Sequence, residues 1–184
     1  LELGINEDAF VYLNFGNART YKGIESLVNA FSEVKDADAR LLLMNRSSFN
    51  PEYGKEIVDL SSGDDRVLAH TSEYFPDSAF QTFLNAADVG VFPFSYVMTS
   101  GSVIQALGFG LPVVAPRLGC LAELVVDKVG ILYDPSDPVG IVTALNQIRK
   151  QDVLRMGQEA RNLAESLDWA TIAGQTAKLY HNES

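Results

Sequence analysis

The sequence predicts an α/β domain in which a parallel β-sheet is covered by helices on both faces. Short apolar runs alternate with amphipathic segments along the whole chain, as they do when helices connect parallel strands. The 184 residues are enough to bury a substantial core, and the hydrophobic fraction of 47% is ordinary for a globular protein. We therefore expect one domain over residues 1–184.

The first half of the chain contains three strand–helix units. Apolar runs of strand length occur at Ala9–Phe15, Ala39–Met44 and Arg66–His70. The helices expected after them are Lys22–Val34, Pro51–Leu60 and Pro76–Ala87. Apolar residues recur at helical spacing in the first and third of these: Ile24, Leu27, Val28 and Phe31, then Phe80, Phe83, Leu84 and Ala87. Proline suits the first turn of the helix expected at Pro51–Leu60, because a backbone N–H has no partner within the helix there.

The second half continues the alternation. Strands are expected at Asp88–Pro93, Pro112–Ala115 and Gly130–Tyr133. A short helix is expected after Ser102, and Gly108 and Gly110 end it. A second short helix is expected near Ala122–Val126. Three longer helices are expected over about 138–150, 152–167 and 170–181. The last two carry apolar faces, which pack either on this domain or on another part of a longer protein: Leu163 and Leu167, then Ile172, Thr176 and Tyr180.

The turn at Thr99–Ser102 is the first candidate binding site. Ser100, Gly101 and Ser102 precede an apolar helix, and the free N–H groups of a helix start suit a phosphate. Many α/β proteins carry a similar helix and bind nothing there, so both interpretations stay open. Ligands of parallel sheets lie beyond the carboxyl ends of the strands, which is where this turn falls.

Composition limits the partners and the compartment. The formal charge of −10 disfavours nucleic acid and anionic membranes as general partners. The single cysteine, Cys120, excludes an internal disulfide and a cysteine-rich metal site. No apolar run approaches the ~18 residues of a membrane span, and no signal-peptide pattern opens the chain. We therefore expect a cytoplasmic protein.

Several motifs lack the context that their chemistry requires. Asp36-Ala-Asp38 resembles a metal-holding aspartate pair, but it precedes its strand and so falls at the wrong edge of the sheet. Gly108-Phe-Gly110 also precedes a strand and lacks the third glycine of a dinucleotide motif. His70 and His181 are not at ligand spacing. His70 ends a predicted strand, where it could touch a ligand, but we expect it to cap or pack. No metal site is predicted.

The loop Gly16–Gly23 is the second candidate site. It follows the first strand at the correct edge, and it places Arg19 and Lys22 three residues apart. A guanidinium grips a phosphate in bidentate fashion, and an ammonium neutralises the remaining charge. The alternative is that Lys22 only occupies the first turn of a helix. A cation is mildly unfavourable there, which favours phosphate binding.

Four ordered blocks of sequence together resemble a known family. They are Phe15–Ile24, Ala86–Pro93, Gly110–Pro116 and Gly119–Glu123. In this order and spacing they are similar to the carboxyl-terminal, donor-binding half of retaining group 1 glycosyltransferases, which have the GT-B fold with Rossmann-like sheets. Asp168–Tyr180 resembles the start of the closing helix of that family, expected over 168–184.

The resemblance implies a function for each loop. This half would bind a UDP- or GDP-sugar, with no metal and no separate cofactor, and Arg19 and Lys22 would stabilise the departing diphosphate. The amides of Ser100–Ser102 would meet the phosphates, and the segment Thr71–Phe75 would line the base. The other residues implied to bind the donor are Gly16, Tyr74, Phe75, Thr99 and Gln105, together with Ser100, Gly101 and Ser102.

One departure from the family concerns the sugar and ribose contacts. The family carries two glutamates eight positions apart, and here Val97 and Gln105 stand in their places. Gln105 still accepts a hydrogen bond, weaker by roughly 1 kcal/mol than one to a carboxylate. Val97 makes no polar contact. The hydroxyls of Thr99–Ser102 are candidates to replace part of the lost interaction.

The expected reaction is transfer of a sugar, with retention of configuration, to a glycan or lipid-linked acceptor. An amino-terminal half outside this sequence would hold the acceptor and make any peripheral membrane contact, so this fragment alone would be inactive. The alternatives are a non-catalytic nucleotide-sugar-binding module that has lost its glutamates, and a sugar-nucleotide epimerase of the same fold. An epimerase needs acid and base groups, and no convincing set is present.

Overall fold

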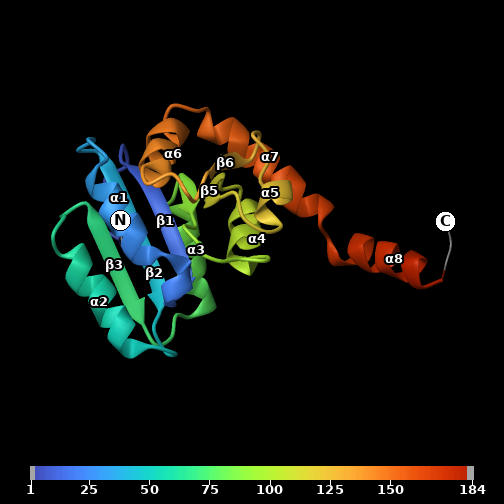
Figure 1. Ribbon diagram of the computed structural model, residues 1–184, viewed down its shortest axis with the longest axis horizontal. Helices are drawn as coiled ribbons and strands as arrows, with labels where there is room; N and C mark the ends of the chain where they lie inside the picture. The colour runs from blue at the N-terminus through green and yellow to red at the C-terminus, as the bar shows by residue number, and fades with distance from the viewer. Residues whose placement is uncertain (1–2, 182–184) are drawn as a thin grey trace.

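The computed structural model describes residues 3–181 and confirms the predicted α/β architecture. Within these residues, six strands form one parallel sheet in the order β3-β2-β1-β4-β5-β6 (Figure 1). The strands are β1 (Phe10–Asn17), β2 (Ala39–Arg46), β3 (Val67–Ser72), β4 (Val89–Val91), β5 (Val113–Pro116) and β6 (Gly130–Tyr133). The helices are α1 (Ile24–Ser32), α2 (Pro51–Ser61), α3 (Asp77–Asn85), α4 (Gly101–Gly108), α5 (Leu121–Leu124), α6 (Gly140–Ile148), α7 (Val153–Ser166) and α8 (Trp169–Tyr180).

The strand order reverses between β1 and β4. The chain builds outward from β1 through β2 to β3, and then returns to the other side of β1 with β4. Loops leaving the carboxyl ends of two such strands diverge to opposite faces of the sheet, which opens a crevice for a ligand. The loop after β1 and the loop after β4 both carry the sequence-predicted site residues. The topology therefore brings the two candidate loops to one place.

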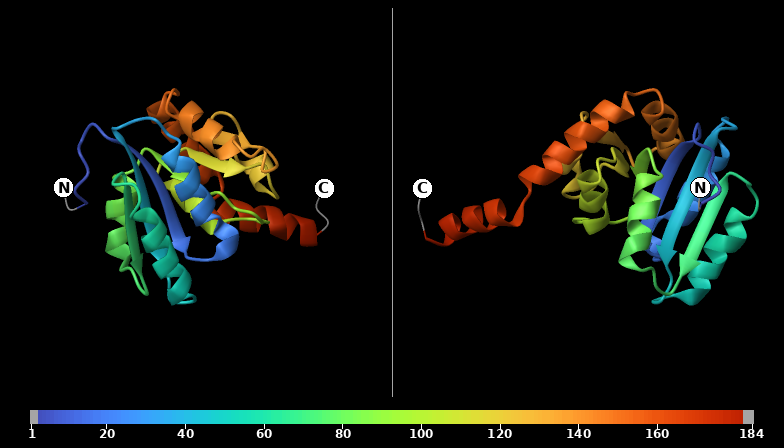
Figure 2. Two further views of the ribbon diagram at one scale, coloured as in Figure 1. Left: turned by 60° about the vertical axis from the view of Figure 1, so that its left-hand side comes forward. Right: turned by 180° about the vertical axis from the view of Figure 1, so that it is seen from behind.

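Helices cover both faces of the sheet (Figure 2). Two apolar layers hold them against it. Along β1, Tyr12 faces one layer, whereas Val11 and Leu13 face the other. The first layer receives α1, α2, α6 and Met156 of α7, and the second receives α3, α4 and Ala160 of α7. Side chains alternate between the faces of a strand, so the nearly continuous apolar runs of β1 and β2 reflect burial on both faces.

The predicted helix Lys22–Val34 is divided in the structure. A single 3-10 turn, η1 (Thr20–Lys22), precedes α1, and Gly23 between them adopts a left-handed backbone with φ of 67°. A β-carbon at Gly23 would overlap the carbonyl oxygen of Pro93. Glycine is therefore required by both the backbone conformation and the close approach of the loop after β4. Lys22 lies before the helix and not in its first turn.

The end of the fourth predicted strand also differs. β4 ends at Val91, two residues before the expected Pro93, because the chain turns toward the loop after β1. There the backbone N–H of Ser95 donates to the carbonyl oxygen of Tyr21 at 2.9 Å. In the preceding α3, Phe83 and Leu84 are buried as expected, whereas Phe80 is only half-buried. Ala87, also half-buried, lies beyond the end of the helix.

The last two helices behave differently from each other. α7 packs closely on the turn after α4, where a β-carbon at Gly157 would overlap the carbonyl oxygen of Gly110, and its Leu163 packs against the core. α8 extends away from the rest of the molecule (Figure 1) and contains no buried residue. Its expected apolar face, with Ile172 and Tyr180, therefore does not pack on this domain. Residues 182–184 of the expected closing segment lie outside the described residues.

Replacing Gly23 is expected to destabilise the domain. Gly23→Ala should lower the free energy of unfolding by roughly 2 kcal/mol or more, because an L-residue is strained in the left-handed region and its β-carbon would overlap Pro93. Gly108→Ala is the control, since its β-carbon would meet only Ala164 at 4.0 Å at the end of a helix where alanine is favourable. Urea unfolding of both variants measures the difference, and equal effects would contradict the role of Gly23.

Candidate functional site

Gly16, Lys22 and Ser102 converge at the carboxyl end of β1. The ammonium nitrogen Nζ of Lys22 lies 3.5 Å from Oγ of Ser102, which is 80 residues away in sequence. Gly16 lies between them: a β-carbon at this position would be 2.6 Å from Lys22 Nζ and 3.1 Å from Ser102 Oγ. The absence of a side chain at Gly16 leaves room for the Lys22 ammonium and the α4 N-terminus to meet. The structure thus brings together three of the expected donor-site residues.

Lys22 is a buried cation without a carboxylate partner. Its side chain is only 9% exposed, and its Nζ lies 5.7 Å from the centre of the Phe94 ring. Burial lowers the pKa of the Lys22 ammonium below its ordinary value, and the nearby positive charge of Arg19 lowers it further. Within residues 3–181 no ion pair involves Lys22. A buried cation without a counter-ion is costly for the fold, which suits a site that receives an anion.

The loop after β4 holds this arrangement in place. The Ser95 N–H and hydroxyl both donate to the Tyr21 carbonyl oxygen, at 2.9 and 3.3 Å. On the other side, the Cys120 N–H donates to the Met98 carbonyl oxygen at 2.9 Å. The loop is therefore fastened to both the loop after β1 and the loop after β5. These contacts limit its movement at the point where α4 begins.

The turn at Thr99–Ser102 begins α4, but its residues have different surroundings. Ser100 is buried and caps the helix, because its Oγ accepts a hydrogen bond from the Val103 N–H at 3.4 Å. Its hydroxyl is therefore occupied within the fold. Thr99 and Gly101 are exposed, and Ser102 is half-buried beside Lys22. Of the three serine and threonine hydroxyls expected at the site, only that of Ser102 touches the buried cation.

Arg19 does not join Lys22 and Ser102 in the free structure. Its side chain is exposed, and the guanidinium carbon lies 4.7 Å from the centre of the Phe49 ring in the loop after β2. The sequence analysis expected both cations to meet the hydroxyl-rich turn, and the structure brings only Lys22 there. Arg19 lies on the surface, where its guanidinium makes a cation–π contact with an exposed aromatic ring.

The segment expected to line the base contains one exposed and one packed aromatic residue. Tyr74 is 66% exposed. Phe75 is half-buried and meets the Phe83 ring edge-on, with ring centres 6.1 Å apart. His70 lies within β3, two residues before its end, and its ring packs edge-on against Phe83, at 5.1 Å. This contact agrees with the packing interpretation of His70.

A small pocket adjoins Gly16 on the side of Phe75. Its lining residues are Gly16, Met44, Arg46, Phe75 and Phe80. Arg46 is a further cation at this end of the sheet that no sequence motif contains. Its position two residues after the apolar run that ends at Met44, as the last residue of β2, is the signal that could have found it.

The two positions at which this chain departs from the family motif differ in their exposure to solvent. Val97 is 9% exposed and belongs to the apolar layer beneath α4. Gln105 is exposed on α4, three residues after Ser102. A side chain at Gln105 is therefore accessible to a ligand, whereas that of Val97 contributes to the core.

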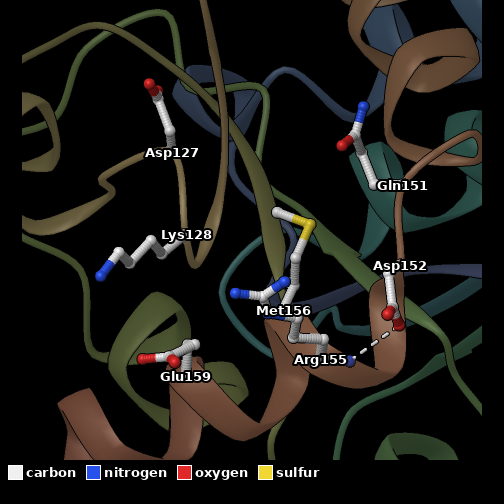
Figure 3. Close-up of a pocket in the computed structure, with 7 residues that line it drawn as sticks. All are labelled: Asp127, Lys128, Gln151, Asp152, Arg155, Met156 and Glu159. Carbon is white, nitrogen blue, oxygen red and sulfur yellow. Dashed lines mark hydrogen bonds between the residues drawn. The ribbon is translucent and has the colours of Figure 1, made fainter.

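A larger depression lies at the amino ends of the strands, and Figure 3 shows the residues that line it. It has a volume of about 240 Å³, and its lining residues are Asp127, Lys128, Gln151, Asp152, Arg155, Met156 and Glu159. These residues precede β6 and begin α7, so they lie at the amino ends of the strands. The lining combines three carboxylates with two cations, Lys128 and Arg155. It is therefore separate from the Lys22 site.

Within the part of the chain that the structure describes, no group of three or more histidine, cysteine, aspartate and glutamate side chains is placed to hold a metal ion. No helix between residues 3 and 181 is both long and apolar enough to cross a membrane.

Comparison with known proteins identifies the family. Residues 9–151 match the family model described as glycosyl transferases group 1, which covers more than half of the chain. The chain belongs to this family. A D-inositol 3-phosphate glycosyltransferase of Corynebacterium efficiens is 31% identical over 191 residues. That alignment covers 97% of this chain but 44% of the relative, so the chain spans less than half of the relative's length.

Solved structures show the same architecture. A sucrose-phosphate synthase from Thermosynechococcus elongatus superposes with a TM-score of 0.80 at 26% identity, covering 98% of this chain and 47% of that one. The Anabaena protein HepE, solved in complex with UDP and glucose, gives a TM-score of 0.80 at 21% identity, covering 98% of this chain and 50% of its own. The fold is therefore that of the Rossmann-like domains of GT-B proteins.

Removing the buried charge of Lys22 is expected to stabilise the free domain. Lys22→Met should raise the free energy of unfolding at pH 7 by roughly 1 kcal/mol, because it removes a buried charge that no carboxylate compensates. The folded state holds the Lys22 proton less tightly than the unfolded chain does. The free energy of unfolding of the wild type therefore rises as the pH increases from the lowered pKa of Lys22 to 10.5. The advantage of Lys22→Met should therefore shrink over that range.

Urea unfolding between pH 7 and 10.5 measures this effect. Lys35→Met is the control, because Lys35 is exposed and its Nζ lies 3.7 Å from a carboxylate oxygen of Glu33. This substitution should change the free energy of unfolding little. A Lys22→Met variant less stable than the wild type at pH 7 would show that the ammonium contributes favourably to the free fold.

Proposed function

We propose that this chain is the carboxyl-terminal, donor-binding half of a retaining glycosyltransferase that uses a nucleotide-diphosphate sugar. The observation that carries the proposal is the buried, unpaired ammonium of Lys22 beside Ser102 and Gly16. It lies at the switch point of a parallel sheet, where such folds bind ligands. Membership of the glycosyl transferases group 1 family and the likeness to a protein solved with UDP support it.

The diphosphate is the part of the donor that fits this site. Lys22 supplies a charge at the end of β1, and the N-terminus of α4 supplies Gly101 and Ser102. Backbone N–H groups at a helix start and a buried ammonium both favour a negative group. In a chain of net charge −10, this local arrangement attracts an anion that the rest of the surface repels.

The same groups would assist departure of the diphosphate. As the bond between the sugar carbon and the diphosphate oxygen breaks, negative charge grows on that oxygen. A preformed ammonium stabilises the developing charge more strongly than water does, because it need not reorganise. Arg19, now over Phe49, is exposed and can move to the phosphates when a donor binds. This half therefore supplies leaving-group stabilisation, and we assign no nucleophile to it.

The acceptor would be a glycan or a lipid-linked sugar held by an amino-terminal half. The chain spans 44% of the Corynebacterium relative, which leaves room for a second domain in a protein of that length. α8, without a buried residue, exposes Trp169, Leu179 and Tyr180. We propose that this closing helix packs on the other half of the enzyme.

A non-catalytic module that binds a nucleotide sugar is the second candidate. Val97 is buried in the apolar layer, so no polar contact to the sugar comes from that position. Gln105 is accessible, but it is neutral where the family motif has a carboxylate. These two observations favour weaker sugar and ribose contacts with an intact diphosphate site. Turnover by the full-length protein distinguishes the two candidates.

Nucleotide binding by the 184-residue chain tests the donor site. Isothermal titration calorimetry with UDP, GDP and ADP should show binding of at least one of them. Lys22→Met should weaken it by roughly 10- to 100-fold, as expected for losing a charge-assisted hydrogen bond, and Arg19→Ala by a smaller factor. Lys35→Met should leave it unchanged. Binding that survives Lys22→Met would refute the assignment.

Trp169 reports on the proposed packing of α8. It is the only tryptophan of the chain, and it is 87% exposed. In the 184-residue chain its fluorescence should be quenched readily by acrylamide, as for a residue in water. In a full-length protein that contains no other tryptophan, quenching should fall several-fold if α8 is covered, since a buried ring is protected. Equal quenching in both proteins would contradict the packing.

A further inference from the structure

Arg46 is the third cation at the carboxyl edge of the sheet, and it lies beside the donor site. It ends β2 and is paired in register with Asn17, the residue after Gly16. Alternation along the strand places Arg46 on the same face as Met44, which is the face covered by α3. The inference drawn from it below rests on the proposed donor site.

The guanidinium of Arg46 is free to bind a ligand. Among residues 3–181 it forms no side-chain hydrogen bond and no ion pair, and the residue is exposed. Other arginines of the sheet layer are engaged: Arg66 pairs with Asp64 at 2.6 Å, and Arg40 donates to the carbonyl oxygens of Ala37 and Ala39. A guanidinium has five N–H donors and no acceptor, so its preferred partner is an oxygen or nitrogen acceptor.

The walls of the adjacent pocket define the shape of that partner. Met44, Phe75 and Phe80 supply apolar and aromatic surface, and Gly16 joins the pocket to Lys22 and Ser102. Aromatic walls of this kind suit a flat ring better than a charged phosphate. The enclosed volume of about 20 Å³ is room for one or two groups of the size of a water molecule. An exocyclic oxygen of a ring fits that space, whereas a whole base would lie across the mouth.

We propose that Arg46 selects the base of the donor by donating hydrogen bonds to a ring carbonyl oxygen. Uracil and guanine carry such an oxygen, whereas adenine presents an exocyclic amine in the corresponding region. An amine facing a guanidinium places hydrogen-bond donors against hydrogen-bond donors. The polar groups left unpaired then weaken the binding of adenine relative to uracil or guanine. Arg46 is thereby a specificity-determining residue, and Lys22, which adjoins Gly16, holds the diphosphate.

The alternative partner for Arg46 is the diphosphate itself. Both partners offer oxygen acceptors, so affinity for a nucleotide alone does not separate them. Inorganic pyrophosphate carries the phosphates without a base. A comparison of pyrophosphate with nucleotides therefore tells whether Arg46 contacts the base or the phosphates.

The experiment is calorimetry of the 184-residue chain with UDP, GDP, ADP and pyrophosphate. The wild type should bind UDP or GDP at least tenfold more tightly than ADP, a factor of the size that a bidentate arginine contact supplies. Arg46→Met should reduce this preference to roughly threefold or less and leave pyrophosphate affinity within about twofold. Arg46→Lys, which keeps the charge but not the planar fork, should lose most of the preference as well.

Arg117→Met is the matched control. Arg117 is an exposed arginine that follows β5 at the same edge and does not line the pocket, so its loss changes the net charge equally. It should leave the base preference unaltered. Thermal melting of all three variants checks that they fold as the wild type does.

The outcomes separate this inference from the proposed donor site. A base preference that survives Arg46→Met overturns the inference, as does an equal loss of pyrophosphate and nucleotide affinity. If Lys22→Met still abolishes binding in those cases, the donor site stands. If the wild type binds no nucleotide, or Lys22→Met has no effect, the donor site falls and the inference with it.

Discussion

The close backbone approach between the loop after β1 and the loop after β4 is the constraint on which the site depends. Gly23 lies against the Pro93 carbonyl oxygen in a conformation that only glycine adopts without strain. The approach is reinforced by the hydrogen bonds from Ser95 to Tyr21. It places Lys22 between two loops and away from water. The buried ammonium is a consequence of this packing and not of any local helix preference.

The burial of Lys22 connects stability with function. The fold accepts an uncompensated charge at the end of its central strand, and the helix start that follows β4 presents Ser102 to it. In the free protein this arrangement costs stability, and an anion would remove the cost. In the proposed function, that anion is the departing diphosphate of a donor. A site of this kind is preorganised because neither the ammonium nor the helix start must move.

The carboxyl edge as a whole divides into parts with different chemistry. Lys22 and the start of α4 form a charged centre, Phe75 and Phe80 form an apolar wall, and Arg46 also lines the pocket beside that wall. In the proposed function, the charged centre holds the diphosphate and the aromatic wall lies beside the base. α8, which projects from the domain without a buried residue, belongs to a different contact.

The amino-acid sequence by itself determined the layers, the positions of the strands and the two loops that carry the site, because the period of apolar residues is a local property. It also indicated Lys22 and Ser102 through their motifs. Only the tertiary structure decided that these two meet, that Arg19 rests on Phe49, and that Arg46 joins the pocket. Those contacts depend on strand order and register, which connect residues up to 80 positions apart and leave no local pattern.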